Sequence, residues 1–470
     1  MRGVLYVGAM AQTSRVTKGL PPGPSGWLWT TIRLLRDPIG ALHEWREEYG
    51  STFTIRLLDS PIVMTCEPEL VRQIYAVTDT EQFGSNIPAS FAALSGAESL
   101  LMLSGARHHA ERKLLMPAFH GERMRGWAQA MVDAARRAFA GGGEFPVLER
   151  TRQATLEVIV RLVFGASDAD QVDEFTRLAG AWARAVRPGF LFVSALQREF
   201  LGLSAFARFR RASDALDRSL MQQIATTRAN PGSRTDVLAS MVGARYDDGS
   251  AMTDAAICDQ LHTLLFAGHD TTAVVLAWAL YFLARDPEAL ERSRSEADAL
   301  GPEPDAEALA RLPWLGAVVD ETLRLRPVTS EAIRRLHKPW QLGSWQLPAG
   351  VSVSAVAPLI HSRADLWPEP EQFRPERFLA ERPSPTVYLP FGGGARRCIG
   401  ATFARFEACV ILSTLLREFE FESRVDQVVW GRGLLILEPI GGVPMRVRPR
   451  EASPLVGQGS GDMGTMPLRV

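Results

Sequence analysis

The sequence is poor in cysteine and carries almost no net charge. Four cysteines occur in 470 residues, none of them in a CxxC pair: Cys66, Cys258, Cys398 and Cys409. Such scattered cysteines argue against a disulfide scaffold and against a zinc site. They favour a reducing compartment, so we expect a cytoplasmic protein. The formal net charge of −1 gives no global sign of a nucleic-acid partner.

Long hydrophobic runs are also missing. The apolar patch within residues 1–10 and the longest run, residues 273–284, are both too short to span a bilayer, so we expect no membrane anchor. No linker-like tract divides the chain, which predicts one domain over residues 21–450 with a core able to bury a large cofactor. Residues 1–20 are expected to be disordered, and residues 451–470 to form a flexible tail.

Apolar residues recur at helical spacing along most of the chain, so the predicted fold class is mainly α with a minor β region. Thr253 can cap a helix that runs to Arg285, which would be about 50 Å long and must cross most of the molecule. Its second half is apolar on every side, as expected of a buried helix. Residues 84–106 are predicted to be a loop. Shorter elements are expected as a helix over 38–49 and strands over 52–57, 62–66, 340–342, 345–347, 351–356, 433–437 and 445–447.

One stretch near the C-terminal end organises the rest, from Phe391 through three consecutive glycines to Cys398 and Gly400. Three glycines in a row cannot form the interior of a helix or strand, so the backbone there must lie close to another group. A helical apolar run follows and puts Cys398 at a helix N-terminus, which favours a thiolate, as do Arg396 and Arg397. A lone cysteine is usually a small buried apolar residue, but a thiolate in such a loop can bind a soft metal or a haem iron.

A second unusual stretch, residues 267–272, lies in the middle of the long helix. Gly, Asp and Thr are poor helix formers, and here they stand where a buried helix should be most regular. This local conflict indicates a functional site rather than a solvated kink. Thr271 can donate a hydrogen bond to the carbonyl of Ala267 and open the helix, and the Asp270 carboxylate would then line the opening with the Thr271 hydroxyl.

The spacing Phe391-x-x-Gly394-x-Arg396-x-Cys398-x-Gly400 resembles the haem-ligand loop of the cytochrome P-450 (haem-thiolate) family, and the helix stretch resembles the family's oxygen-binding motif. The resemblance spans about residues 20–450, with the motifs in the family's order. It implies the cytochrome P-450 fold, in which a long central helix and a cysteine-ligand loop enclose haem b.

The same resemblance assigns roles to residues of both motifs. Cys398 is expected to ligate the iron through its thiolate. Asp270 is the expected catalytic acid and Thr271 the catalytic alcohol. Residues expected to contact the cofactor within the loop are Phe391, Arg396, Cys398 and Gly400.

A weaker motif is the pair Glu321 and Arg324, which share one face of a helix. Such a pair alone is common. With Arg377, in the downstream stretch 375–378, it resembles the family's structural cluster that locks the core around the haem. We therefore expect these three residues to be structural and not chemical.

His108 and Arg112 are spaced i, i+4, so both can reach one anion. In isolation such a pair would more often belong to a solvated face. In the family these positions hold a haem propionate, and Arg335 is a further expected contact.

The implied activity is that of a monooxygenase that inserts one atom of O2 into a lipophilic substrate by hydroxylation or epoxidation. A fatty-acid-, terpenoid- or polyketide-like molecule is expected, since the stretch 117–124 looks like bacterial members linked to fatty acids or terpenoids. No bound flavin or iron–sulfur cluster is expected, so electrons must come from a ferredoxin or flavodoxin-type donor with its reductase. A monomer is expected. Candidates for the docking face are Arg112, Lys113, Arg397 and Arg405.

Two alternatives stay open. The first is a peroxide-dependent or isomerase-type haem-thiolate enzyme, and the second is a non-enzymatic haem sensor. The first needs no redox partner, and the second needs no proton relay. The intact pair Asp270 and Thr271 disfavours both.

The substrate pocket is expected to be apolar, under a mobile lid that the family forms near residues 190–193. The expected lining residues are Leu101, Phe190, Phe192, Ala267, Val328, Ala332 and Leu434.

Overall fold

The computed structural model describes residues 19–57, 60–79, 81–119, 124, 126–232, 234–432 and 436–450. Residues 1–18 of the expected N-terminal segment and the expected tail, 451–470, lie outside the described residues. Leu20, which we expected to be disordered, is 4% exposed and shares an apolar cluster with Val63 and Val353. Ordered structure therefore begins before Pro21.

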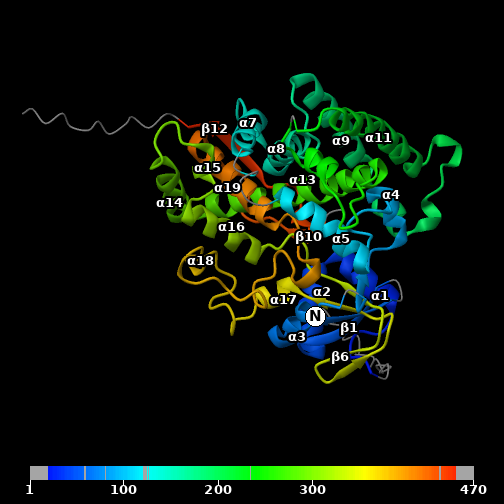
Figure 1. The fold of residues 1–470 in the computed structure, drawn as a ribbon. Helices are drawn as coiled ribbons and strands as arrows, with labels where there is room; N and C mark the ends of the chain where they lie inside the picture. Colours follow the sequence, from blue (N-terminus) through cyan, green and yellow to red (C-terminus); the bar gives the residue numbers. More distant parts are fainter. Residues whose placement is uncertain are drawn as a thin grey trace, which may run out of the picture.

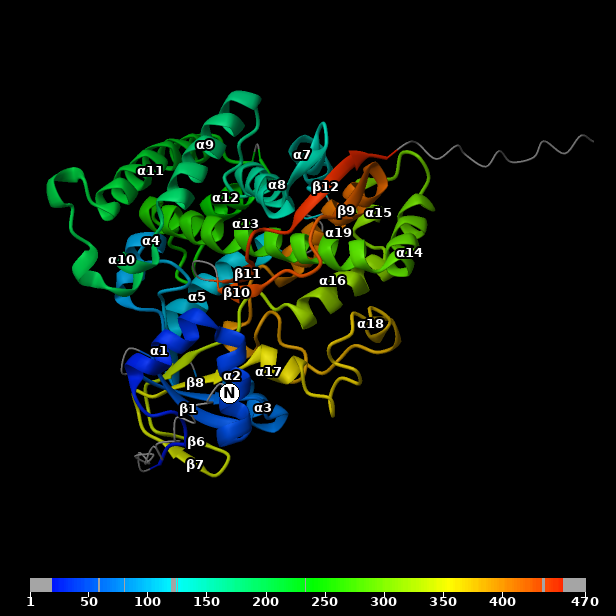
Figure 2. The ribbon, with the colours of Figure 1, turned by 180° about the vertical axis from the view of Figure 1, so that it is seen from behind.

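The chain folds into a large helical part and a smaller β-rich part. Figures 1 and 2 show the N-terminal segment (blue) and the yellow strands from the second half of the chain side by side in the smaller part. The helices are α1 (Trp27–Arg36), α2 (Pro38–Tyr49), α3 (Pro68–Ala76), α4 (Ala92–Ser95), α5 (Gly105–Leu115), α7 (Ala128–Phe139), α8 (Val147–Leu162), α9 (Ala169–Ala185), α10 (Pro188–Phe192), α11 (Ala205–Ala229), α12 (Val237–Gly243), α13 (Asp254–Arg285), α14 (Pro287–Asp298), α15 (Ala306–Leu309), α16 (Pro313–Leu325), α17 (Ala357–His361), α18 (Arg377–Ala380) and α19 (Ala401–Glu418).

The main sheet joins distant parts of the chain in the order β1-β2-β8-β5-β3. Strands β2 and β8 are parallel, with Val63 opposite Val353, and the other neighbours are antiparallel. Smaller sheets pair β4-β12-β9, β6-β7 and β10-β11. The strands are β1 (Thr52–Leu57), β2 (Ser60–Thr65), β3 (Phe83–Ser85), β4 (Gly143–Pro146), β5 (Arg334–Leu336), β6 (Trp340–Leu342), β7 (Trp345–Leu347), β8 (Ser352–Ala355), β9 (Phe419–Ser423), β10 (Trp430–Arg432), β11 (Leu437–Pro439) and β12 (Pro444–Pro449).

Most predicted elements are present at the predicted places. The helix expected over 38–49 is α2, with Asp37 as its N-cap, and the strands expected over 340–342 and 345–347 are β6 and β7. The stretch 84–106 differs from the predicted loop, because it contains the short elements β3 and α4 and the start of α5. The strand expected over 433–437 falls partly outside the described residues.

Helix α13 crosses the centre of the helical part (Figure 2). Thr253 caps it as predicted, since its side chain accepts a hydrogen bond from the Ala256 N–H at 3.1 Å. The helix is long and apolar enough to cross a membrane, yet most of its apolar stretch is buried within the protein. Because α8, α11, α16 and α19 pack around it, α13 is the core helix of the fold.

Candidate active site

The cysteine loop, residues 391–400, folds back on itself in front of α19. The Cys398 N–H donates to the Phe391 carbonyl at 2.9 Å. Gly394 has a φ of 63°, a conformation that favours glycine. A Cβ on Gly393 would lie 2.2 Å from the Tyr75 ring, and one on Gly394 would lie 2.6 Å from the Tyr75 carbonyl oxygen. The glycine run is therefore required by the close approach of α3.

Arg334 of β5 holds the loop from the other side. It is 3% exposed, and its guanidinium donates to the carbonyls of Gly393 at 2.5 Å and Ala332 at 2.6 Å. It also lies over the Tyr75 ring, 5.1 Å from the ring centroid. Side chains alternate along a strand, so Arg335 points the other way and is exposed. Of the two arginines, Arg334 is the one that contacts the cysteine loop, and a cofactor contact by Arg335 stays a prediction.

The Cys398 side chain reaches accessible space although protein atoms surround it closely. Burial raises the pKa of its thiol, whereas the Gly400 N–H and the charges of Arg112 and Arg397 lower that pKa. The net direction is upward, contrary to the expectation from a helix N-terminus, because desolvation outweighs the hydrogen bond and the cations. A coordinated metal reverses this balance, since a thiol bound to a metal loses its proton.

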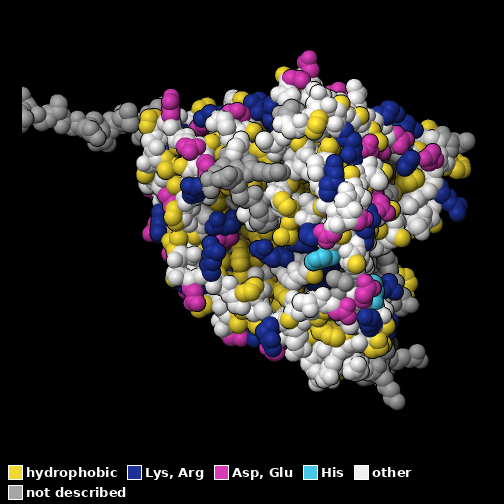
Figure 3. Space-filling model, in the orientation of Figure 1, with side chains coloured by type: hydrophobic (Ala, Val, Ile, Leu, Met, Phe, Trp, Pro, Cys, Tyr) yellow, Lys and Arg dark blue, Asp and Glu magenta, His cyan; other side chains and the backbone are white. Residues whose placement is uncertain are grey.

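Several basic side chains gather beside the loop. Burial, then Arg396 and Arg112, lower the pKa of His108 to about 4. Burial, then Arg334 and Arg112, lower the pKa of Arg396 to about 10. A hollow lined partly by His108, Arg334 and Arg396 lies between α3, α5 and the loop. Figure 3 shows Lys and Arg side chains gathered around a hollow with hydrophobic walls on this face. Both lowered pKa values show that positive charge is disfavoured in this cluster. An anion bound among these groups would offset that cost and would itself be stabilised.

These residues fit a haem. Cys398 offers a thiolate to the iron, and the basic cluster matches the carboxylates of the propionates. Arg396 is oriented by hydrogen bonds to the Leu103 carbonyl and to the Ser104 hydroxyl, the latter at 3.2 Å. A Cβ on Gly400 would meet no protein atom within 4 Å, so protein packing alone does not require glycine there.

In the unusual stretch of α13, residues 267–272, the predicted hydrogen bond is present but the predicted opening of the helix is not. Thr271 Oγ1 donates to the Ala267 carbonyl at 2.7 Å, as predicted. The helix nevertheless stays continuous, so the expected opening is absent. The Thr155 hydroxyl of α8 donates to the His269 carbonyl at 2.8 Å, a contact from the neighbouring helix that leaves α13 continuous. Ala267 is exposed in the middle of this otherwise buried helix, which marks an accessible surface beside Thr271.

Asp270 belongs to a charged network that the sequence did not reveal. Arg152 Nε of α8 donates to Asp270 Oδ1 at 2.5 Å, and another nitrogen of the same guanidinium donates to Glu438 Oε2 at 2.5 Å. All three side chains are partly buried. No spacing rule links residues 152, 270 and 438, so only the fold brings them together.

Glu321 and Arg324 form a buried cluster, as the family resemblance implied. Arg324 donates to both carboxylate oxygens of Glu321, at 2.6 and 2.8 Å, and both residues are at most 1% exposed. Arg377 Nε reaches the same carboxylate at 3.3 Å. The remaining Arg324 donors bind backbone carbonyls of the irregular segment 361–372, so the cluster ties α16 to the chain leading into the cysteine loop.

His361 extends this connection. Its Nδ1 donates to the Arg324 carbonyl at 2.9 Å, and its Nε2 accepts from the Leu389 N–H at 2.9 Å. The Leu389 carbonyl in turn accepts from the Gly392 N–H at 3.1 Å, at the start of the cysteine loop. Burial and then Arg324 lower the pKa of His361 to about 3, so the ring is neutral and can accept at Nε2.

Glu407 is a buried acid that the sequence analysis missed. It lies on α19, is 0% exposed, and neither carboxylate oxygen has a hydrogen-bond partner in the described part of the chain. Burial raises its pKa to about 8 and outweighs the lowering by the neighbouring Thr272 hydroxyl, which lies outside hydrogen-bond geometry. The proximity of Glu407 to Thr272 shows that α19 crosses α13 directly beside Thr271.

The expected lid residues differ in their surroundings. Phe190 is 2% exposed, and its ring packs against Phe206 and Phe209 with centroid distances of 5.5 and 5.1 Å, so it belongs to the core beneath α11. Phe192 is 39% exposed. Leu434 lies outside the described residues.

The other expected lining residues surround the loop and α13. Ala332 Cβ would lie 3.5 Å from a Cβ on Gly392, so this residue touches the cysteine loop. Val328 is buried, and its carbonyl accepts from a β11 N–H at 2.8 Å. Leu101 is half-buried and Ala267 is exposed.

The expected docking residues are partly neutralised. Lys113 Nζ lies 2.6 Å from Asp247 Oδ1, and Arg405 Nη2 lies 3.0 Å from Asp320 Oδ2. The charges of the other two members of the set, Arg112 and Arg397, lower the pKa of the Cys398 thiol.

The family model described as Cytochrome P450 matches residues 20–433. A Mycobacterium tuberculosis (strain ATCC 25618 / H37Rv) protein with the provisional name cytochrome P450 135B1 is 36% identical over 419 residues, which cover 86% of each chain. The same strain has a protein provisionally named cytochrome P450 138, which is 35% identical over 85% of this chain and 90% of its own.

Two solved structures share the fold. Retinoic acid bound cyanobacterial CYP120A1 is 25% identical and superposes with a TM-score of 0.79 over 92% of this chain and 99% of its own. The cytochrome P450DA heme domain, 24% identical, gives a TM-score of 0.80 over 92% of this chain and 98% of its own.

Proposed function

Because this chain belongs to the cytochrome P450 family, we propose that it is a haem-thiolate monooxygenase that hydroxylates or epoxidises a lipophilic substrate. The family uses O2 and in general a separate redox partner. The observation that carries the proposal is the accessible Cys398, held in a glycine-walled loop beside a buried cluster of basic side chains.

Each role follows from the contacts of the residue. The Cys398 thiolate would bind the iron, while His108, Arg334 and Arg396 would hold the propionates. When bound, haem with a thiolate ligand supplies the activation of O2. Arg334 serves both purposes, because it also binds the Gly393 carbonyl and so fixes the loop that carries Cys398.

Protons would reach the reacting oxygen through α13. Thr271 Oγ1 donates to the Ala267 carbonyl and can equally donate toward the accessible surface beside it. Asp270 Oδ1 accepts from Arg152, so it must leave that partner to pass a proton toward Thr271. Release of one ion pair is a small side-chain motion, and Glu438 keeps Arg152 in place meanwhile.

The substrate is proposed to be a lipophilic molecule such as a fatty acid, terpenoid or polyketide. The apolar residues Val328, Ala332 and Ala267 near the loop and α13 support this, and the solved relative with retinoic acid bound is consistent with it. We propose a ferredoxin or flavodoxin-type donor that docks near Arg112 and Arg397, and a cytoplasmic monomer.

The test uses haem-loaded protein. Reduced and CO-treated, it should absorb at the position diagnostic of thiolate ligation, and Cys398→Ser should lose that band. Turnover with a surrogate ferredoxin and reductase should then give oxygenated product from a substrate found by optical shift. Product formed only with added peroxide would favour the peroxide-dependent alternative, and haem binding without any turnover would favour a sensor.

A further inference from the structure

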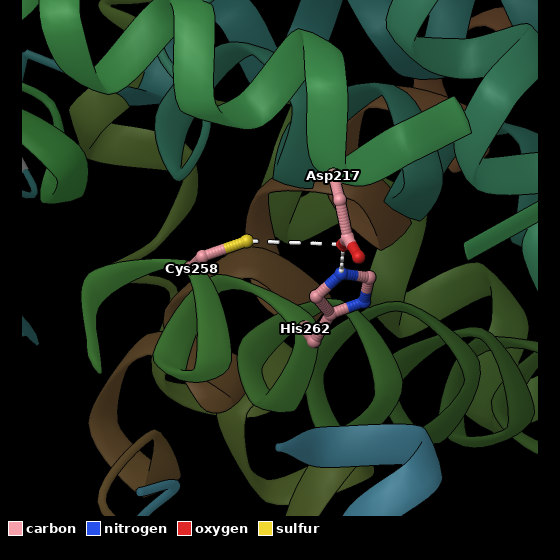
Figure 4. Close-up of side chains that lie close together, drawn as sticks. All are labelled: Asp217, Cys258 and His262. Carbon is pink, nitrogen blue, oxygen red and sulfur yellow. Dashed lines mark hydrogen bonds and ion pairs between the residues drawn. The ribbon is translucent and has the colours of Figure 1, made fainter. Parts of the chain in front are cut away.

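Three side chains with metal-binding atoms meet between α11 and the N-terminal half of α13. Cys258 and His262 are one turn apart on α13, and Asp217 points at them from α11 (Figure 4). Their ligand atoms all lie within 4.8 Å of one another. His262 Nε2 lies 2.5 Å from Asp217 Oδ1, and Cys258 Sγ lies 3.8 Å from the same oxygen.

The trio is buried on one side and open on the other. Cys258 and His262 are 7% and 5% exposed, whereas the Asp217 side chain is 42% exposed. Trp182 of α9 covers the His262 ring, with a centroid distance of 5.3 Å. A cation could therefore enter past Asp217 and meet two ligands that the protein already holds in place.

The hydrogen bonds within the trio leave it incompletely satisfied. The Cys258 thiol and the His262 N–H share one Asp217 oxygen, and His262 Nδ1 is buried without a partner among the described residues. Burial, then the charges of Asp217 and Asp259, raise the pKa of the Cys258 thiol to about 12. These carboxylates give the place a negative potential, which favours a cation.

We propose that Asp217, Cys258 and His262 bind one Zn²⁺ ion, with water as the fourth ligand. Sulfur, imidazole nitrogen and carboxylate oxygen form a donor set suited to zinc, whereas Mg²⁺ and Ca²⁺ prefer oxygen ligands alone. Zinc bond lengths put tetrahedral ligand atoms about 3.3–3.6 Å apart. The exposed Asp217 must then move about 0.8 Å away from His262, which a side-chain rotation provides.

The charges balance in the bound state. Coordination forms one bond each to sulfur, nitrogen and oxygen and releases the Cys258 thiol proton to solvent. It also transfers the His262 proton from Nε2 to Nδ1, where a water molecule must accept it because no described group does. The thiolate and the Asp217 carboxylate then neutralise the divalent ion, and no group changes oxidation state. Because the ligands come from two helices, the ion would tie α11 to α13. This inference goes beyond the proposed monooxygenase function and does not depend on it.

The experiment is a Zn²⁺ titration of untagged, haem-loaded protein against a chromophoric chelator. One equivalent should bind, and calorimetry in buffers of different ionisation enthalpy should show close to one proton released. Co²⁺ in place of Zn²⁺ should give a thiolate charge-transfer band. Cys258→Ser and His262→Gln should each weaken zinc binding by more than roughly 100-fold, since loss of an outer-shell partner alone costs about 10–100-fold.

Cys66→Ser is the matched control, because Cys66 is also a buried cysteine but its thiol donates to the Ser51 carbonyl. It should bind zinc like the parent. Asp217→Asn is exposed enough to keep the fold and should also weaken binding. Zinc affinity that is unchanged in both Cys258→Ser and Asp217→Asn, or no stoichiometric binding to the parent, would overturn the proposal and leave the trio as a hydrogen-bonded set.

Discussion

Arg152 and Asp270 form an ion pair with a nitrogen–oxygen distance of 2.5 Å, although they lie 118 residues apart in the chain. The pair joins α8 to α13 immediately beside Thr271. It follows that the acid proposed to feed protons is held by a cation until it is needed.

We predict that Asp270→Asn slows O2 consumption on the order of 100-fold at saturating substrate, since an amide cannot pass on a proton. Haem content and the reduced CO spectrum should stay those of the parent. Glu438→Gln is the matched control, because it removes the other partner of Arg152 and leaves Asp270 intact. Equal slowing in both variants would mean that the network is structural and not a relay.

Thr271→Ala removes a hydroxyl while leaving haem, thiolate and pocket in place. Reducing equivalents should still be consumed, but hydrogen peroxide should rise and product should fall several-fold, because protons reach the wrong oxygen atom. Donor oxidation, peroxide and product are measured together. Thr155→Ala, which loses a hydroxyl bonded to the same helix through the His269 carbonyl, is the comparison variant. Unchanged coupling in Thr271→Ala would exclude this residue from the relay.

Glu321→Ala should give little haem-loaded protein. It leaves the Arg324 guanidinium buried without its carboxylate, at a cost of about 3–5 kcal/mol in the free energy of unfolding. Thermal melting and the haem-to-protein absorbance ratio measure the effect. Glu376→Ala, at an exposed ion pair with Arg292, should change stability by less than about 1 kcal/mol. Parent-like loading of Glu321→Ala would show that the buried pair is dispensable.

The two neighbouring arginines of β5 give a paired test of the cofactor contacts. Arg334→Gln should lower haem retention, because it removes a buried cation and the hydrogen bond to the Gly393 carbonyl. Arg335→Gln, one residue along the strand and exposed, should retain haem like the parent. Haem transfer to an acceptor apoprotein gives the rates. The reverse ranking would restore Arg335 as the propionate contact.

Glu407 should make stability depend on pH. Its pKa is raised to about 8 in the folded protein, from 4.5 ordinarily, so the folded state keeps a proton that the unfolded chain loses. The contribution of Glu407 to the free energy of unfolding is therefore fully present below pH 4.5 and is lost as the pH rises to about 8. Glu407→Gln should remove this loss, gaining on the order of 3–5 kcal/mol relative to the parent between pH 5 and 8.5. Parallel melting curves for parent and variant across this range would contradict the assignment.

The sequence predicted the fold class and the cysteine loop well, because both rest on local signals. Helical periodicity, the Thr253 cap and the glycine run around Cys398 are readable from neighbouring residues, and the cytochrome P450 fold is confirmed. The hydrogen bond of Thr271 to Ala267 is also local, one turn apart.

Contacts between distant segments were not predictable in the same way. The choice between Arg334 and Arg335 depends on the register of a three-residue strand. Arg152 meets Asp270 only because α8 packs along α13, and no spacing rule marks that meeting. The opened helix was predicted wrongly, since α13 stays continuous although the Thr155 hydroxyl of α8 also donates to its His269 carbonyl.

His361 supports the cysteine loop through hydrogen bonds that do not change with pH in the range where most histidines titrate. With its pKa near 3, the ring stays neutral and keeps both hydrogen bonds throughout the range in which most histidines switch charge. The position of the loop relative to Arg324 is thus fixed by these two hydrogen bonds and does not depend on the protonation of His361. The unfolded chain, however, takes up a proton at this residue below pH 6.5, so acid weakens the whole mount. Acid therefore acts on this residue only through unfolding of the whole support, at a loss of about 1.4 kcal/mol for each pH unit below 6.5, and not through a local change in the folded loop.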